Sequence, residues 1–206
     1  MDKLNSQSTE LQIMDVAEQL FLEKGFAMTS TTEIAKQVGC NQALVHYYYR
    51  SKEKLFLLIF RKKIETFANY FVTVGDESMS FEHRLKLRMY AHFEMFQNNP
   101  KMPFMILNEL TTNPRRLQTV KEIFSKAPGL VVSQLEAELK VEFEKGTIRK
   151  MSAVDVMLSA FSLNAGLFLL LPIIKGLSVF PDNEIKNMIE KRKEENYQII
   201  LRSLRE

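Results

Sequence analysis

The sequence predicts an all-α protein of about nine helices. Apolar residues recur every three or four positions along most of the 206-residue chain, which is the spacing of one helix face. Neither Asn-Gly nor Asp-Gly, the strongest short hairpin signals, occurs in it. With 46% apolar residues, 7 Gly and 6 Pro, the chain can bury a sizeable core and is too apolar for a disordered protein.

The first two predicted helices end at glycines. A first apolar stripe ends at Gly25, because glycine readily adopts the left-handed conformation that closes a helix. Residues 30–33 (STTE) form a capping box, in which a hydroxyl and a carboxylate bond the first turn of a helix over 31–38. Gly39 ends that helix.

Polar caps start the next two helices. Asn41 caps a short helix over 41–47, and Ser51 caps a long fourth helix from Lys52 past Phe71. Later segments are predicted to be helical from the same apolar spacing, and they cover residues 81–99, 103–112, 115–145, 152–171 and 182–205.

One stretch, Val156–Ile174, contains no charged residue and is near the lower length limit for a membrane span. Serine, asparagine and glycine dilute it, and Pro172 is expected to end its helix before Ile174. We interpret it as a helix buried all round, in a core or in a subunit interface. The alternative is a membrane-associated interaction protein anchored by residues 156–174.

Other features favour a cytoplasmic protein without catalytic chemistry. The single cysteine, Cys40, is typical of a reducing compartment, and the polar N-terminus lacks the apolar core of a signal peptide. Nucleotide-binding and nucleophile motifs are missing, and no His, Cys or Asp residues have metal-ligand spacing. We therefore predict neither an enzyme nor a cofactor, and no metal site.

The helices over 31–38 and 41–47, joined by a tight turn at Gly39, form a helix-turn-helix pattern. In such a motif the second helix projects an exposed face that can enter a DNA major groove roughly 12 Å wide. Asn41, Gln42, Ala43 and His46 lie on the candidate face. Glutamine is suited to the adenine edge, and alanine permits close approach.

Charge is concentrated around this pattern. The whole chain has a net charge of only +3, but residues 36–63 carry seven basic side chains and one acidic one. A local excess of positive charge is what binding to phosphates requires. Lys52 begins a helix, where free backbone N–H groups also favour phosphate. The hydroxyls of Thr31, Tyr47 and Tyr48 are of the kind that position a duplex without reading it.

The segments LFLEKGFAMTSTTEIA and VGCNQALVHYYYRSKEKL sharpen this interpretation. Residues 13–55 resemble the DNA-binding domain of TetR-family (tetracycline-repressor-like) bacterial transcription regulators. The chain departs from the common pattern at Tyr49, where phenylalanine is usual, so the added hydroxyl is expected to reach the surface or a partner. It also departs at His46, a position often filled by tyrosine, so no base preference carries over.

The resemblance implies roles for single residues. Gln42, Ala43 and His46 would contact bases. Phosphate contacts would come from Thr31, Asn41, Tyr47, Tyr48 and Lys52.

The resemblance also implies an organisation. Residues 1–50 would form the helix-turn-helix domain, joined through the long fourth helix to a helical ligand-binding and dimerisation domain over 51–206. A homodimer, closed by the helices near 152–171 and 182–205, would bind a near-palindromic double-stranded operator. A small-molecule effector that enters the larger domain would release the homodimer from the operator.

A ligand site is the less specific part of the prediction. An apolar wall with a few polar groups is the usual composition of such sites, although the same residues at helical spacing also fit a plain core. A ligand there is expected to be largely apolar, because few charges fall on these faces. The candidate lining residues are Met89, His92, Phe93, Phe96, Phe104, Met105, Asn108, Phe124, Phe161, Asn164 and Phe168.

Overall fold

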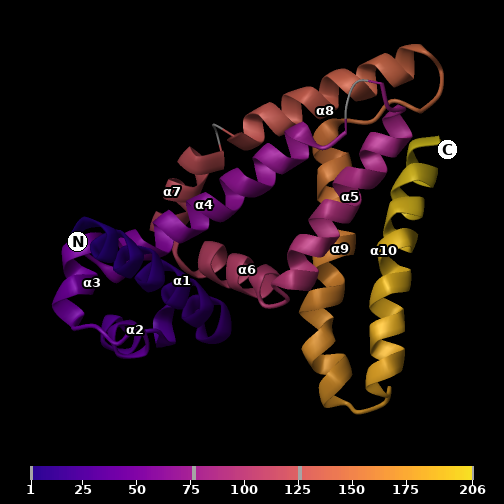
Figure 1. The fold of residues 1–206 in the computed structure, drawn as a ribbon. Helices are drawn as coiled ribbons and strands as arrows, with labels where there is room; N and C mark the ends of the chain where they lie inside the picture. Colours follow the sequence, from indigo (N-terminus) through magenta and orange to yellow (C-terminus); the bar gives the residue numbers. More distant parts are fainter. Residues whose placement is uncertain (1, 76–77, 125–126, 206) are drawn as a thin grey trace. The chain divides into compact units, whose positions relative to one another are not determined.

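A computed structural model describes residues 2–75, 78–124 and 127–205, and these residues form ten helices and no strand (Figure 1). The all-α prediction is confirmed. The predicted segment 115–145, which the Pro128-Gly129 pair punctuates in the sequence, forms two helices, and the described residues contain ten in all. In chain order the helices are α1 (Asp2–Met28), α2 (Thr31–Val38), α3 (Gln42–Tyr49), α4 (Lys52–Thr73), α5 (Phe81–Asn98), α6 (Met102–Thr112), α7 (Pro114–Phe124), α8 (Ala127–Glu144), α9 (Ala153–Gly176) and α10 (Asp182–Arg205).

The chain forms two compact units. The first unit comprises Met1–Ile64 together with Met105–Leu117, and the second comprises Glu65–Phe104 and Gln118–Glu206. Helices α4, α6 and α7 therefore each contribute residues to both units. The 105–117 segment joins the first unit although it follows that unit's other residues by about forty positions, a placement that no local pattern predicts.

The predicted caps of the first unit are present. Gly25 has a φ of 78°, which breaks the helical geometry near the end of α1. The Ser30 hydroxyl accepts a hydrogen bond from the Glu33 N–H at 3.1 Å, and the Glu33 carboxylate pairs with Lys24. Gly39, with a φ of 77°, ends α2 in the left-handed conformation. These caps place α2 and α3 on either side of a three-residue turn over residues 39–41.

Aromatic rings fill the core of the first unit between α1 and α4. The Phe21 and Phe56 ring centroids lie 5.2 Å apart, edge to face, and the Phe26 ring is 5.3 Å from that of Phe56. Ile34 of α2 and Val45 of α3 are buried, which packs both short helices onto this scaffold. Burial of such side chains typically contributes about 1.5–3 kcal/mol each.

In the second unit, α5 packs against both α9 and α10, and α8 packs against α9. Its buried core is apolar and consists of Phe81, Leu85, Met89, Leu135, Leu139, Ile148, Ala153, Val156, Tyr197, Ile200, Leu201 and Leu204. Arg88 of α5 is 1% exposed and donates two hydrogen bonds, of 2.8 and 2.7 Å, to the Glu138 carboxylate of α8. This bidentate pair fixes α8 against α5.

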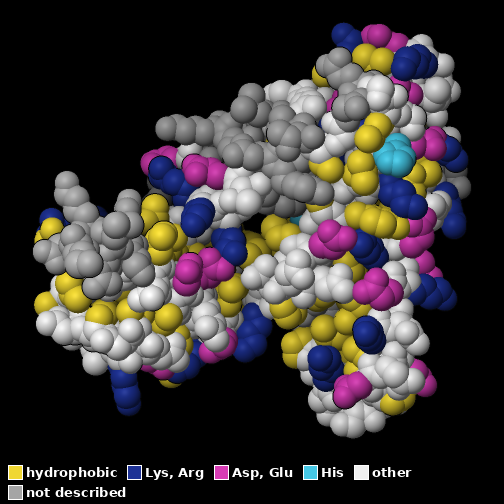
Figure 2. All heavy atoms as spheres, viewed as in Figure 1, with side chains coloured by type: hydrophobic (Ala, Val, Ile, Leu, Met, Phe, Trp, Pro, Cys, Tyr) yellow, Lys and Arg dark blue, Asp and Glu magenta, His cyan; other side chains and the backbone are white. Residues whose placement is uncertain are grey.

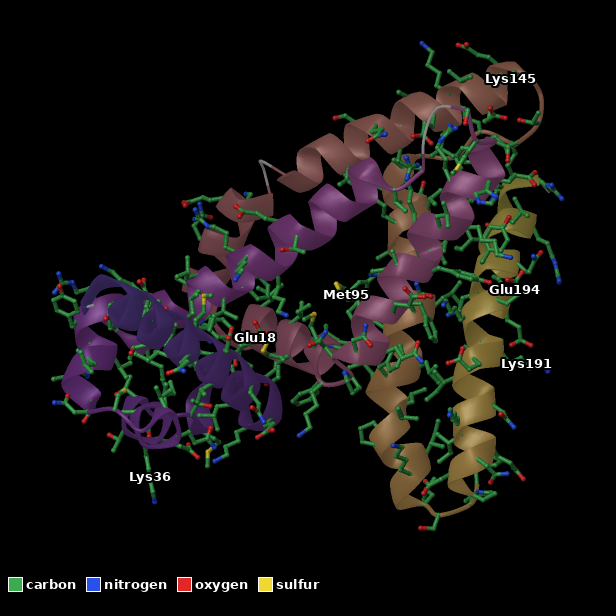
Figure 3. The ribbon with its side chains drawn as sticks, in the orientation of Figure 1. Glu18, Lys36, Met95, Lys145, Lys191 and Glu194 are labelled. Carbon is green, nitrogen blue, oxygen red and sulfur yellow. The ribbon has the colours of Figure 1, made fainter. Side chains whose placement is uncertain are left out.

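Ion pairs line the seam between α5 and α10, where basic and acidic side chains are interspersed (Figure 2). Lys86 lies 2.8 Å from the Glu194 carboxylate, and Lys193 pairs with Glu94. Hydrogen bonds from Lys86, and then from Tyr90 and Gln198, lower the pKa of Glu194 to about 2. The Lys86 and Glu194 side chains are 38% and 42% exposed, with Glu194 on α10 (Figure 3), so this pair contributes little to stability.

Helix α9 corrects one expectation. It continues through Pro172 to Gly176, so the predicted end before Ile174 is wrong. A proline removes one intrahelical hydrogen bond, and hydrogen bonding resumes beyond it, since the Leu177 N–H donates to the Ile173 carbonyl at 2.9 Å. Within the described residues of one chain, the apolar stretch of α9 is 22% buried, and its burial in a subunit interface stays a prediction.

The exposed side of α9 is a broad apolar face, which we call the α9 face. It consists of Val154, Leu158, Leu170, Ile173 and Leu177, all of them exposed. Within the described residues, α9 is the one helix whose length and composition would allow it to cross a membrane. An apolar face of this size on one helix is typical of a surface that another protein covers.

Candidate nucleic-acid interface

Helix α3 has an inward and an outward face. Val45 and Tyr49 point inward and are buried. The Asn41 side chain accepts a hydrogen bond from the Ala43 N–H at 2.6 Å, which confirms Asn41 as the N-cap and starts the helix. The outward face consists of the exposed residues Gln42, Ala43, Leu44, His46 and Tyr47. A short helix that is anchored on one side and bare on the other is the form of a recognition helix.

Three of the predicted contact residues are brought together across the turn. The Gln42 Nε2 donates to the Thr31 hydroxyl at 2.9 Å, which ties α3 to the first residue of α2. The same Nε2 lies 3.5 Å from His46 Nε2, and His46 Nδ1 lies 3.4 Å from the Arg50 carbonyl oxygen. Thr31 is therefore placed to orient the amide of Gln42.

The two remaining tyrosines differ in exposure. Tyr47 is 67% exposed, and its ring stands edge to face against that of half-buried Tyr48, with centroids 5.2 Å apart. On α2, Lys36 extends away from the helix (Figure 3). Asn41, at the start of α3, is also exposed. These positions leave polar groups around the outward face of α3, as a phosphate-binding rim requires.

Lys52 is placed differently from the others. Its half-buried ammonium donates to the carbonyl oxygens of Phe26 at 2.9 Å and Thr29 at 2.7 Å, and lies 4.2 Å from the Phe26 ring centroid. Burial lowers the pKa of Lys52, and the nearby positive charge of Arg116 acts in the same direction. Lys52 thus closes the end of α1, and its contact with phosphate stays a prediction.

The two-residue connection between α3 and α4 contains one strained residue, Arg50. Arg50 has a φ of 64° and a ψ of −40°, and the Ser51 N–H donates to the Tyr49 carbonyl at 2.7 Å. This is a three-residue turn with a positive φ at a residue that carries a Cβ, a conformation that costs about 1–3 kcal/mol. Such strain persists only where the surrounding contacts hold it.

Arg116 of α7 is the residue of the first unit that the sequence did not reveal. It is 4% exposed, its guanidinium donates twice to the Glu53 carboxylate at 2.8 Å, and it also pairs with Glu109. Its carbon Cζ lies 3.6 Å from the Phe26 ring centroid and 4.8 Å from that of Phe56. The hydrogen bond from Arg116 is the main reason that the pKa of Glu53 is lowered.

The hydroxyl of Tyr49 does reach a partner. It donates to the Glu10 carbonyl oxygen at 2.8 Å, which joins the end of α3 to an early turn of α1. Burial raises the pKa of Tyr49 to about 12, with smaller contributions from the negative charges of Glu10 and Asp15. The extra oxygen that distinguishes this position is thus part of the packing of the first unit.

We expect Tyr49→Phe to lower the free energy of unfolding by about 1 kcal/mol, because the part-buried hydrogen bond to the Glu10 carbonyl is lost. Urea denaturation followed by circular dichroism measures the change. Tyr47→Phe removes the same oxygen from an exposed ring and is expected to stay within about 0.5 kcal/mol of the unmodified protein. Equal effects of the two substitutions would show that the Tyr49 bond contributes nothing.

Seven of the eleven candidate ligand residues lie together in the second unit. The His92 and Phe96 ring centroids are 4.8 Å apart, and those of Phe96 and Phe161 are 5.9 Å apart. The Asn164 Nδ2 donates to the Met89 carbonyl at 3.2 Å. The residues so connected are Met89, His92, Phe93, Phe96, Phe161, Asn164 and Phe168.

The other four are placed elsewhere. Phe104 is 66% exposed, and Met105 and Asn108 belong to the first unit. The side chain of Phe124 lies outside the described residues. Conversely, Asn196 of α10 contacts the seven-residue group and was missed, because the charged run around it (EKRKEEN) is typical of a solvated helix.

Sequence comparison identifies the family of the helix-turn-helix. The family described as "Bacterial regulatory proteins, tetR family" matches residues 13–59. The chain is 25% identical over 114 residues to the fatty acid metabolism regulator protein of Bacillus subtilis, which is 55% of this chain and 59% of the relative. It is 39% identical over 61 residues to the biofilm operon icaADBC negative transcriptional regulator IcaR of Staphylococcus epidermidis, 30% of this chain and 31% of the relative. The chain thus spans less than two thirds of the length of these relatives.

Solved structures share the fold over nearly the whole chain. The transcriptional regulator FadR from Bacillus subtilis, in complex with stearoyl-CoA, has a TM-score of 0.71 over 94% of this chain and 98% of that one, at 17% identity. At this identity the likeness shows the fold alone. The family match over residues 13–59 and the capped helix-turn-helix agree, so this part of the chain is similar to the tetR family of bacterial regulatory proteins.

Proposed function

We propose that the chain is a ligand-responsive transcriptional repressor that binds a near-palindromic operator as a homodimer and is released by a small, largely apolar effector. The outward face of α3 carries this proposal, because it is exposed, polar at Gln42 and His46, and held by Thr31 within a tetR-type motif. The name of IcaR, a negative regulator, supports repression. The proposal includes a cytoplasmic location and a regulatory rather than an enzymatic role, which the match to a family of bacterial regulatory proteins supports.

On DNA, the outward face of α3 enters the major groove. Gln42, Ala43 and His46 meet base edges there. The phosphates around them are bound by Thr31, Asn41, Tyr47 and Tyr48. Lys52 also binds a phosphate, through the N–H group that remains after its ammonium has donated to two carbonyl oxygens.

The homodimer forms through α9 and α10, near residues 152–171 and 182–205. The apolar α9 face supports this arrangement, because a second copy of the same face would remove it from water. Two recognition helices must then lie about 34–36 Å apart, or a multiple of that distance, to reach successive half-sites. The comparisons give no support to the membrane-anchored alternative.

The effector binds the second unit at the seven-residue aromatic group around Phe96. One relative is a fatty acid metabolism regulator, and the similar structure of FadR contains stearoyl-CoA, so long-chain acyl compounds are the first to test. Helices α4, α6 and α7 would transmit the effect of the effector from the second unit to the first, since each contributes residues to both units. Arg116 is the residue through which α7 holds the start of α4.

In vitro selection from random duplex DNA tests the function, with native mass spectrometry of the purified protein reporting the dimer and any retained ligand. We expect selection to recover an inverted repeat bound by two chains. We expect Gln42→Ala to change the selected base at one position of each half-site, at a cost of about 1–3 kcal/mol on the original operator.

Gln37→Ala is the matched control, because Gln37 is an exposed glutamine on α2 rather than on the outward face of α3. It is expected to leave both the selected sequence and its affinity unchanged. If both variants select the same sequence with the same affinity, Gln42 does not read DNA. If no inverted repeat is enriched at all, the proposed function is wrong.

A further inference from the structure

Three polar side chains from three helices meet inside the second unit. His92 of α5 is 9% exposed, Asn164 of α9 is 1% exposed, and Asn196 of α10 is fully buried. We call them the polar cluster. The surrounding wall is aromatic, with Phe96 edge to face on the His92 ring and Phe161 tilted against it. Polar groups in such a setting are costly unless each one is hydrogen-bonded.

The hydrogen bonds of the polar cluster run in one direction. Asn196 Nδ2 donates to Asn164 Oδ1 at 2.9 Å, and Asn164 Nδ2 donates to the Met89 carbonyl and, at 3.1 Å, to His92 Nδ1. Since an amide nitrogen can only donate, His92 Nδ1 accepts, and the ring proton sits on Nε2. The amide orientation at Asn164 is thus fixed by three partners.

One acceptor remains. Asn196 Oδ1 is the buried side-chain atom that has no hydrogen-bond partner among the described residues. Turning the Asn196 amide over would not help, because two carbonyl oxygens, those of Asn164 and Asn196, would then face each other. A leucine there would avoid the penalty of an unsatisfied oxygen, so the asparagine is expensive for a purely structural position.

The polar cluster is also electrically neutral. Burial lowers the pKa of His92 to about 4, so the ring is uncharged at neutral pH. The two asparagines carry no charge. A carboxylate placed here would bring a buried negative charge and only acceptor atoms against an acceptor oxygen.

We propose that the polar cluster is the polar end of the effector site and binds a neutral hydrogen-bond donor, a hydroxyl or an amide N–H, on an otherwise apolar molecule. The donor hydrogen goes to Asn196 Oδ1, and the chain of the molecule packs on the Phe96 and Phe161 rings. This inference rests on the proposed ligand response and names its ligand class: hydroxylated or amide-bearing lipids bind, and free fatty acids are rejected.

Three probes that share a ten-carbon chain and differ in their polar group test this assignment. 1-Decanol can donate a hydrogen bond, decyl methyl ether cannot donate one, and decanoate is charged. Because the chain contains no tryptophan, isothermal titration calorimetry is the suitable measurement. We expect the full-length protein to bind decanol about tenfold more tightly than either of the other probes, the value of one well-made hydrogen bond.

Asn196→Leu is expected to abolish this preference, so that decanol and the ether bind within about twofold of each other. Ile200→Val, one turn further along α10 and equally buried, is the packing control and keeps the preference. Equal or tighter binding of decanoate by the unmodified protein, retention of the preference in Asn196→Leu, or absence of binding by all three probes overturns the inference. If the variant does not fold, the unmodified protein alone still tests the inference, through the binding of decanoate and through the absence of binding by all three probes.

Operator selection separates the two proposals. If an inverted repeat is recovered but decanol shows no preference, the ligand class is wrong and the DNA-binding function stands. If decanol is preferred but no operator is selected, the polar cluster binds its donor and the regulatory function fails.

Discussion

Arg116→Met is expected to lower the free energy of unfolding of the first unit by about 3–5 kcal/mol. Removing the guanidinium leaves the Glu109 carboxylate, which is 6% exposed as a whole residue, without its cation. It also frees Glu53 and uncovers the faces of Phe26 and Phe56. The free energy of unfolding of a native domain is only about 5–15 kcal/mol in total. Urea denaturation should therefore show a large fall in the denaturation midpoint.

Two variants separate charge from packing. Glu53→Gln leaves Arg116 with Glu109 and changes a half-exposed carboxylate, so we expect a loss of about 1 kcal/mol. Adding Glu109→Leu to Arg116→Met removes the unpaired buried charge and should restore much of the stability. If the double variant is as unstable as Arg116→Met alone, the buried carboxylate is not the cause of the loss.

Leu158→Arg is expected to convert the proposed dimer into monomers and to weaken operator binding at least about 100-fold. The side chain is 63% exposed on the α9 face, so the substitution costs the isolated chain little. In a dimer it would bury two cations opposite each other. A monomer reaches one half-site and loses the gain in affinity from binding two together.

Analytical ultracentrifugation and fluorescence anisotropy on the selected operator measure the two effects. Val141→Arg places the same charge on another exposed apolar residue, on α8, and should remain dimeric with unchanged affinity. A Leu158→Arg protein that sediments as a dimer would show that the α9 face is not the subunit interface.

The fold could be predicted because its signals are local. Ser30, Gly39 and Asn41 each act within one helical turn, and the structure places each at the cap that the sequence indicates. The predicted helix end at Pro172 was wrong because a proline removes one hydrogen bond, and a long helix that is otherwise favourable tolerates this local cost. The outward face of α3 follows from the same local rules, since the buried positions Val45 and Tyr49 leave the rest exposed.

The remaining site residues could not be predicted, because their roles depend on distant partners. Glu53 and Arg116 are 63 positions apart, and nothing near either one marks the other. Asn164 and Asn196 meet across 32 positions, and Asn196 sits in a segment whose charges suggest solvent on every side. Lys52 looked like a phosphate ligand from its helix start, whereas the carbonyls it bonds lie 26 and 23 positions earlier.

The turn at Arg50 restricts how many residues can join α3 to α4. Only Arg50 and Ser51 separate the last residue of α3 from the first of α4, and the turn is closed by a hydrogen bond across a single residue. One added residue would break this closure, because the hydrogen bond from Ser51 to Tyr49 spans one residue only. The angle at which α3 leaves α4 would then change with every side chain intact. The orientation of the outward face of α3 therefore depends on the number of residues in this junction as well as on their identity.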